Sequence, residues 1–187
     1  METIKMKWTG IRPLLMSNGL MMDPLNEYVK RCKEITNKRK KTETDYELLY
    51  RLRWEGSLYF DEESGPFMPN DNIEACIKFG ARKLKLGKDV EAAVLVTNEI
   101  VPLNYSGPRT LEALWVASTF QLKKPTKLGV MSIRPMFPTG WSCEFELEYD
   151  DEIIDRKNIV LVQDIAGRQI GCGAWHPKFG RFLSEVL

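Results

Sequence analysis

The segment 141–149, Trp-Ser-Cys-Glu-Phe-Glu-Leu-Glu-Tyr, constrains the fold most strongly because its apolar and polar side chains alternate without interruption. Successive side chains of a β-strand point to opposite faces of a sheet, so this period of two predicts an antiparallel strand with one buried face. The other face carries Ser142 and three glutamates and is expected to meet water. The side chains expected in the core are Trp141, Cys143, Phe145, Leu147 and Tyr149.

The other periodic segments place this strand in the order βαββαβ. The predicted elements are strands at 3–8, 92–101, 141–149 and 182–186 and helices at 70–85 and 156–166. Asp155 is expected to cap the second helix, and Gly167 is expected to end it. The order is typical of an α+β, ferredoxin-like core, which RRM domains and related RNA-binding proteins also have.

A single domain of residues 1–187 is expected, because a chain of this length can bury most of its apolar surface in one core. Its hydrophobic content of 43% and aromatic content of 10% are typical of a globular protein. Two segments interrupt the βαββαβ order and are predicted to be insertions. One covers about residues 20–60, after the first strand, and the other covers about residues 103–136, between the middle strands.

Both insertions contain predicted elements of their own. Asp23 and Pro24 are suited to the cap and first position of a helix, and Thr42 begins a second helix. Alternation and apolar content then predict strands at 54–60 and at 127–133.

The composition excludes several classes of protein. No apolar run approaches the roughly 20 residues that span a bilayer, and the first residues lack the apolar core of a signal peptide. The four cysteines form no C-x-x-C pair, so neither a zinc site nor a disulfide framework is predicted. We therefore expect a cytoplasmic protein with reduced thiols and no membrane contact.

The net charge of +1 conceals an uneven distribution of charge along the chain. Residues 30–41 hold seven lysines and arginines and a single acid, Glu34, whereas acids gather at 61–63 and 144–155. Such a basic run can contact several phosphates, and each contact adds affinity and salt dependence. A solvated helix end or a mobile arm would have the same composition.

Few residues are candidates for catalysis. His176 is the single histidine, so a metal site built on two histidines cannot form. The chain has neither a phosphate-binding P-loop nor a G-x-G-x-x-G motif. Glu144, Glu146 and Glu148 share a strand face that would either bind a divalent cation or simply meet water. A non-catalytic protein without a metal ion or cofactor is predicted, with His176 as the one candidate general base.

The loop 171–181, Gly-Cys-Gly-Ala-Trp-His-Pro-Lys-Phe-Gly-Arg, combines glycines, cations and flat rings. Glycine permits positive φ and a close approach of the backbone to a ligand. Cations bind phosphates, and rings stack on the bases of single strands. The composition predicts either a nucleic-acid site or a structural loop before the last strand. The candidate binding residues are Gly171, Gly173, Trp175, His176, Lys178 and Arg181, with Phe179 as a second stacking ring.

This loop, which follows a strand and a helix and precedes the last strand, resembles the glycine-rich loop of RAMP proteins. These are the ferredoxin-fold, RNA-binding backbone subunits of CRISPR effector complexes. The exit from the first strand, residues 10–19, resembles the corresponding turn in those proteins. The whole chain also resembles a family of small bacteriophage and prophage proteins, through residues 38–42, residues 134–138 and the Trp-His-Pro-Lys-Phe-Gly-Arg-Phe ending.

The resemblance implies a phage or prophage protein in the host cytoplasm that binds single-stranded RNA or DNA and forms a homo-oligomer along the strand. In the loop, Lys178 and Arg181 would hold a phosphate, and Trp175 or Phe179 would stack on a base. The residues expected to contact phosphates in the basic run are Lys38, Arg39, Lys40 and Lys41.

Two other functions stay open. One is an anti-defence protein that mimics a RAMP subunit and occupies a host defence complex, or that sequesters a signalling nucleotide. The acidic segment 144–155 would then be more important for binding than the basic run. An endoribonuclease would use His176, as some RAMP relatives cleave RNA with a histidine.

Overall fold

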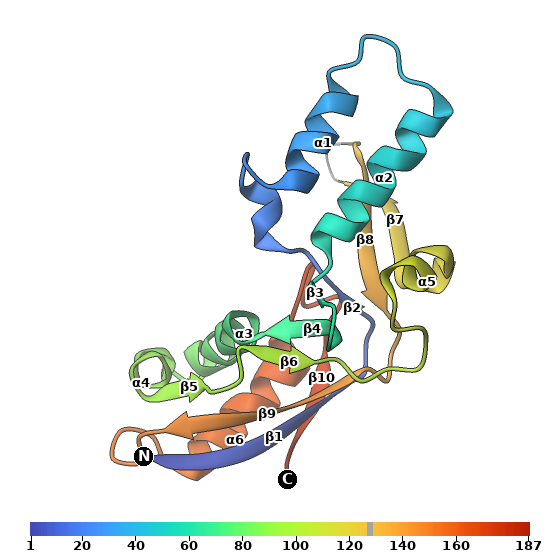
Figure 1. The fold of residues 1–187 in the computed structure, drawn as a ribbon. Helices are drawn as coiled ribbons and strands as arrows, with labels where there is room; N and C mark the ends of the chain where they lie inside the picture. Colours follow the sequence, from blue (N-terminus) through green and yellow to red (C-terminus); the bar gives the residue numbers. More distant parts are fainter. Residues whose placement is uncertain (127–128) are drawn as a thin grey trace.

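The strand predicted at 141–149 lies inside a four-stranded antiparallel sheet (Figure 1). The computed structural model describes residues 1–126 and 129–187. The strand order is β10-β1-β9-β5, and β1 pairs with both β9 and β10. The strands of this sheet are β1 (Glu2–Gly10), β5 (Val94–Val96), β9 (Ser142–Tyr149) and β10 (Phe182–Val186). The protein is therefore a mixed α/β structure with antiparallel sheets.

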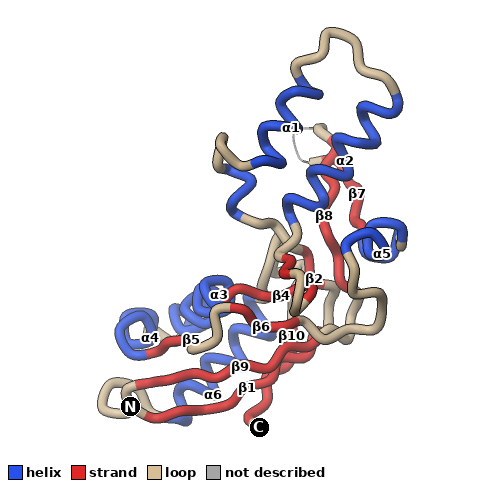
Figure 2. Tube along the Cα trace, viewed as in Figure 1, coloured by secondary structure: helices blue, strands red, loops and turns tan. Residues whose placement is uncertain are grey.

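Helices pack on one face of this sheet (Figures 1 and 2). They are α3 (Asn70–Lys83), α4 (Gly87–Ala93) and α6 (Arg156–Ile165). Asp155 caps α6 as predicted, because its side chain accepts a hydrogen bond from the Asn158 amide at 2.7 Å. Within the described residues, no helix has both the length and the apolar character needed to cross a membrane.

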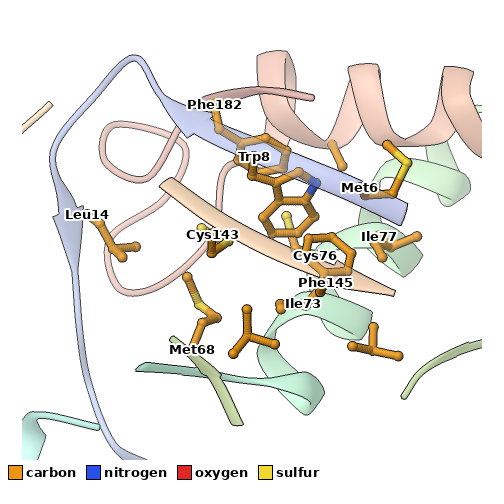
Figure 3. Packing of buried hydrophobic residues seen from close by; sticks show 14 of the residues in the cluster. Met6, Trp8, Leu14, Met68, Ile73, Cys76, Ile77, Cys143, Phe145 and Phe182 are labelled. Atoms are coloured by element: carbon orange, nitrogen blue, oxygen red, sulfur yellow. The ribbon is translucent and has the colours of Figure 1, made fainter. Parts of the chain in front are cut away.

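Trp8 of β1 lies at the centre of the layer between sheet and helices. Its ring stacks on Phe182 with 3.9 Å between ring centroids and meets Phe145 edge-on at 5.0 Å. Its indole N–H donates a 2.8 Å hydrogen bond to Oε1 of the buried Gln163 on α6. Figure 3 shows Trp8 and both rings together with the side chains of α3 that complete the layer, Ile73, Cys76 and Ile77.

The alternation predicted for 141–149 is confirmed. The five inward side chains are at most 4% exposed. On the opposite face, Lys5 pairs with Glu146 at 3.0 Å and Lys7 pairs with Glu144 at 3.4 Å. Both acids lie directly across from their lysines in the β1–β9 register, so this face is a water-facing ladder of opposite charges.

The arm, which comprises the described parts of residues 19–57 and 111–137, stands away from the four-stranded sheet (Figures 1 and 2). Trp54 is buried between its helices and strands and donates a 2.9 Å hydrogen bond to the Phe120 carbonyl. The elements of the arm are η1 (Gly19–Met22), α1 (Glu27–Thr36), α2 (Glu43–Ser57), α5 (Leu111–Val116), η2 (Ser118–Phe120), β7 (Gln121–Pro125) and β8 (Met131–Phe137).

Short strands join the arm to the rest of the molecule. β2 (Leu14–Leu15) pairs with β8, so the segment that leaves β1 is bonded directly to the arm. A separate sheet is formed by β3 (Phe60–Asp61), β4 (Gly65–Pro69) and β6 (Ile100–Pro102). The segments between the core elements are 11–69, from β1 to α3, and 97–141, from β5 to β9.

Two predicted strands are wrong. The segment 92–101 is divided among the end of α4, β5 and the start of β6, because the chain turns at Asn98, whose side chain accepts a hydrogen bond from the Glu146 amide at 3.0 Å. The segment 54–60 begins as the last turn of α2. The helix directs Trp54 toward Phe120, whose carbonyl accepts its hydrogen bond, and directs Leu52 toward α1.

Two helix ends also differ from the predictions. Gly167 does not end α6, because the chain continues through the π-helical turn η3 (Ala166–Ile170) to Gly171, where φ is +76°. A Cβ at Gly167 would lie 2.3 Å from the Phe182 carbonyl oxygen, so this glycine allows close packing rather than a turn.

The helix predicted at Asp23 instead begins at Glu27, where the Asn26 side chain accepts from two amides. The helix predicted at Thr42 is confirmed as α2, with a capping box between Thr42 and Asp45. Of the strand predicted at 127–133, Lys127 and Leu128 lie outside the described residues, and β8 begins at Met131.

Replacing Phe145 by alanine should lower the free energy of unfolding by about 3–5 kcal/mol, because a buried ring that contacts Trp8 is lost. Glu146→Ala, on the water-facing side of the same strand, should cost less than about 1 kcal/mol, since an exposed ion pair stabilises little. Urea denaturation of the two variants measures both losses. Equal losses would contradict the assignment of the faces.

Candidate functional site

The loop 171–181 is fixed to the segment 13–15 by backbone hydrogen bonds. The Ala174 amide donates to the Leu15 carbonyl at 2.8 Å, and the Gly180 amide donates to the Pro13 carbonyl at 2.8 Å. Within the loop, the Cys172 amide donates to the Gly180 carbonyl at 2.9 Å and closes the base of the loop. The loop therefore lies against β2, where the arm joins the rest of the molecule.

The glycines of the loop have the positive φ predicted for them. Gly173 has a φ of +75° and Gly180 a φ of +70°. A Cβ at Gly173 would lie 2.3 Å from the Leu15 carbonyl oxygen, and one at Gly180 would lie 1.8 Å from the Cys172 carbonyl oxygen. The close approach is thus made to the chain's own backbone. The Gly171 amide already donates to the Ala166 carbonyl at 2.8 Å, whereas contact of the Gly173 amide with a ligand stays a prediction.

Trp175 and Arg134 meet between the loop and the arm. Trp175 is half-buried, with a φ of +56°, and the guanidinium carbon of Arg134 lies 5.7 Å from the centroid of its ring. An indole face is the best aromatic partner for a cation. Phe179, the other ring predicted to stack on a base, is only 9% exposed and packs behind Trp175, so that prediction is wrong for Phe179.

Arg134 is a half-buried cation for which the described part of the chain provides no acidic partner. Its Nη1 donates a hydrogen bond to the Ser17 hydroxyl. Among the described residues, its buried Nε has no hydrogen-bond acceptor, and no aspartate or glutamate forms an ion pair with it. Burial lowers the pKa of Arg134, although an arginine keeps its charge at neutral pH. An anion at this position would supply the missing acceptor.

Sequence reasoning did not select Arg134 as a site residue. It opens the Arg-Pro-Met-Phe-Pro segment, and its position in β8 gives no sign of a partner from the last loop of the chain. Only the pairing of β2 with β8 and the attachment of the loop to β2 bring Arg134 and Trp175 together.

His176 lies beside α3. Its ring and that of Phe79 on α3 are inclined by 30°, with 6.3 Å between their centroids. The Arg82 guanidinium lies 5.1 Å from the Phe79 ring centroid. Next to these rings is a cleft of about 220 Å³, lined by residues of β2, β4, α3 and the loop.

The two predicted cations of the loop differ in their surroundings. Lys178 is exposed. Arg181 is half-buried, and its Nε donates a 2.9 Å hydrogen bond to the Pro177 carbonyl, which holds the loop in shape. The exposed side chain of Lys178 can therefore reach a ligand. Arg181 can do so only with the part of its guanidinium that is not bonded to Pro177.

The basic run 30–41 begins on α1, and its last four cations, Lys38 to Lys41, lie in the turn between α1 and α2 at the tip of the arm (Figure 1). Lys38 pairs with Asp45 at 2.6 Å and holds the pKa of that carboxyl below its usual value, and Lys41 donates to the Lys38 carbonyl at 2.9 Å. Arg39 and Lys40 are exposed. The structure does not bring this run next to the loop 171–181, which lies at the other end of the arm.

Charge is divided between the two parts of the molecule. The arm contains 13 lysines and arginines against 8 aspartates and glutamates, whereas the rest of the chain contains 14 against 18. The arm is therefore basic and the part that contains the four-stranded sheet is acidic, although the whole chain is nearly neutral. A polyanion would be attracted to the arm and to its junction with the loop.

Other chemistry in the described residues is limited. No three histidine, cysteine, aspartate or glutamate side chains in residues 1–126 and 129–187 are grouped closely enough to hold a metal ion. Burial raises the pKa of the Cys143 thiol to about 12 and raises the pKa values of Cys76 and Cys172 as well, so these thiols are protonated at neutral pH.

No protein-family model matches the chain, and no curated protein matches it as a relative. The resemblance to RAMP proteins thus stays a prediction.

Gly173→Ala should destabilise the protein by several kcal/mol, because the new Cβ combines an unfavourable φ with a clash against the Leu15 carbonyl. Gly140 provides the matched control, since its φ is +96° but no atom lies within 4 Å of an added Cβ. Gly140→Ala should cost only about 1–2 kcal/mol. Thermal and urea denaturation measure the difference, and equal costs would show that the loop is not clamped to β2.

Proposed function

We propose that this protein binds single-stranded nucleic acid at the junction of the arm and the loop 171–181, without catalysing a reaction on it. The observation that carries the proposal is the pair formed by Arg134 and Trp175. A half-buried guanidinium that no described carboxylate neutralises lies against a half-exposed indole. Together they offer a phosphate contact and a stacking surface, the two elements common to proteins that bind single strands.

The arrangement of the core supports a RAMP-like assignment. In chain order the core elements are β1, α3, β5, β9, α6 and β10, and the sheet order is β10-β1-β9-β5. This matches the pattern of a ferredoxin-like βαββαβ core, which we propose for this protein. The loop 171–181 then lies between the last helix and the last strand, the position of the glycine-rich loop in the proteins that the sequence resembles.

The distribution of lysines and arginines also supports the junction of the arm and the loop as the binding site. A strand held at Arg134 would meet the basic arm, whose tip presents the exposed Arg39 and Lys40, and the exposed Lys178 of the loop. Each phosphate contact would release counterions and add salt-dependent affinity. The open face of the four-stranded sheet is a poorer site, because Lys5 and Lys7 are already paired with glutamates there.

A second candidate function, binding to a protein of a host defence complex, is favoured by a different observation. Leu20, Met22 and Leu25 are 60%, 89% and 73% exposed on one segment of the arm. Exposed apolar groups of this kind mark protein-binding surfaces. A purified defence complex that binds the parent protein and the Arg134→Gln variant equally, but not a Met22→Lys variant, would favour this function over the first.

Arg134→Gln should weaken the binding of an eight-nucleotide single strand by about tenfold or more, because a charge-assisted phosphate contact is lost. The slope of log affinity against log salt should become shallower by about 0.7. Fluorescence anisotropy at several salt concentrations measures both, and Arg156→Gln on α6 is the matched control. An unchanged affinity and slope in Arg134→Gln would refute the phosphate contact.

Replacing Lys38, Arg39, Lys40 and Lys41 together by alanine should flatten the same salt dependence further, by up to about 0.7 for each phosphate contact. The matched control removes four cations outside the arm and thus the same net charge. Its changes are Lys83→Ala, Lys85→Ala, Arg156→Ala and Lys157→Ala. If both fourfold variants lose the same affinity for the strand, the loss results from the change in net charge, and the tip of the arm does not contact the strand.

A further inference from the structure

We propose that the cleft beside the loop receives one base of the bound strand, which inserts between the rings of Phe79 and His176. This inference rests on the proposed function and names the part of the ligand that the cleft recognises. The cleft has a volume of about 220 Å³, smaller than a typical pocket for a drug-sized molecule and suited to a single heterocycle.

The two rings lie near each other and are moderately inclined. Their planes are inclined by only 30°, and their centroids are 6.3 Å apart. A base in van der Waals contact with both rings requires a spacing of about 7 Å, twice the optimal carbon–carbon distance. An exposed histidine on a surface loop can open the remaining gap by rotation of its side chain.

Both apolar and polar residues line the cleft. The apolar ones include Cys76, Met68 and Leu14, which are at most 3% exposed. Asn72 and Ser17 line the cleft as well and bring an amide and a hydroxyl. An amide presents both a donor and an acceptor, which is the pattern that the edge of a base requires.

Ser17 connects this cleft to the proposed phosphate contact. Ser17 lines the cleft, and its hydroxyl accepts the hydrogen bond from Arg134. The phosphate and the base sites are therefore adjacent, as the phosphate and base of neighbouring nucleotides must be. The Arg82 guanidinium also lies near Phe79, 5.1 Å from the centroid of its ring, and adds a cation beside the proposed base site.

The test uses two eight-residue single strands, in both DNA and RNA form. One consists only of abasic nucleotides, and the other is identical but carries a single 2-aminopurine, whose fluorescence falls when it stacks. The parent protein should bind the strand with the base about 5- to 150-fold more tightly, the range expected for one stacked base. Phe79→Leu and His176→Ala should lose this preference, with unchanged affinity for the abasic strand.

Phe67→Leu is the matched control, because it removes a half-buried ring of β4 that does not line the cleft, and it should keep the full preference. Equal binding of the two strands by the parent protein would overturn both the base pocket and the stacking role of Trp175, and would leave only the phosphate contact of Arg134. A preference retained in full by Phe79→Leu and His176→Ala would overturn the base pocket and leave the proposed function intact, because Trp175 would then be the stacking surface. Absence of salt-dependent binding to either strand would overturn both. Displacement of the strand by equimolar adenosine monophosphate would show that the cleft takes a free nucleotide instead.

Discussion

The attachment of the loop 171–181 to the segment 13–15 is the constraint on which the candidate site depends. Two backbone hydrogen bonds, from Ala174 to Leu15 and from Gly180 to Pro13, hold the loop at a distance that only glycine permits at positions 173 and 180. The same short segment pairs with β8 as β2. One extended stretch of chain therefore joins the last loop of the core to the arm, and the contact between Trp175 and Arg134 is a direct consequence.

The junction of the arm and the loop is also where the basic and acidic parts of the molecule meet. The basic arm and the acidic part that contains the sheet meet there, and the half-buried Arg134 lies at their boundary with Ser17 on one side and Trp175 on the other. The open face of the four-stranded sheet is neutralised by its own ladder of lysines and glutamates. The geometry thus favours the side of the molecule where the arm, the loop and α3 converge.

Sequence patterns predicted those elements that are determined by residues close to them in the chain. The alternation of 141–149 gave β9 and its buried face, and Asp155 capped α6, because each signal depends only on neighbouring residues. The segment 92–101 was not divided correctly, although Thr97, Asn98 and Glu99 interrupt its apolar residues, because its two halves are separated by pairing with strands of different sheets that are distant in sequence. Glycines in the loop could be expected to have positive φ, but not to pack against residues 13–15. Arg134 could not be selected, because its partners come from both ends of the chain.

The central claim is that a strand lies across the junction of the arm and the loop 171–181. The most direct measurement is photo-crosslinking of the protein to a single strand that contains 4-thiouridine or 4-thiothymidine, with the adducts located by mass spectrometry. Our account predicts adducts on residues of the loop, Trp175 above all, and on the basic side of the arm, with yields that fall as salt increases. Adducts confined to the open face of β1 and β9, or yields that do not change with salt, would contradict it.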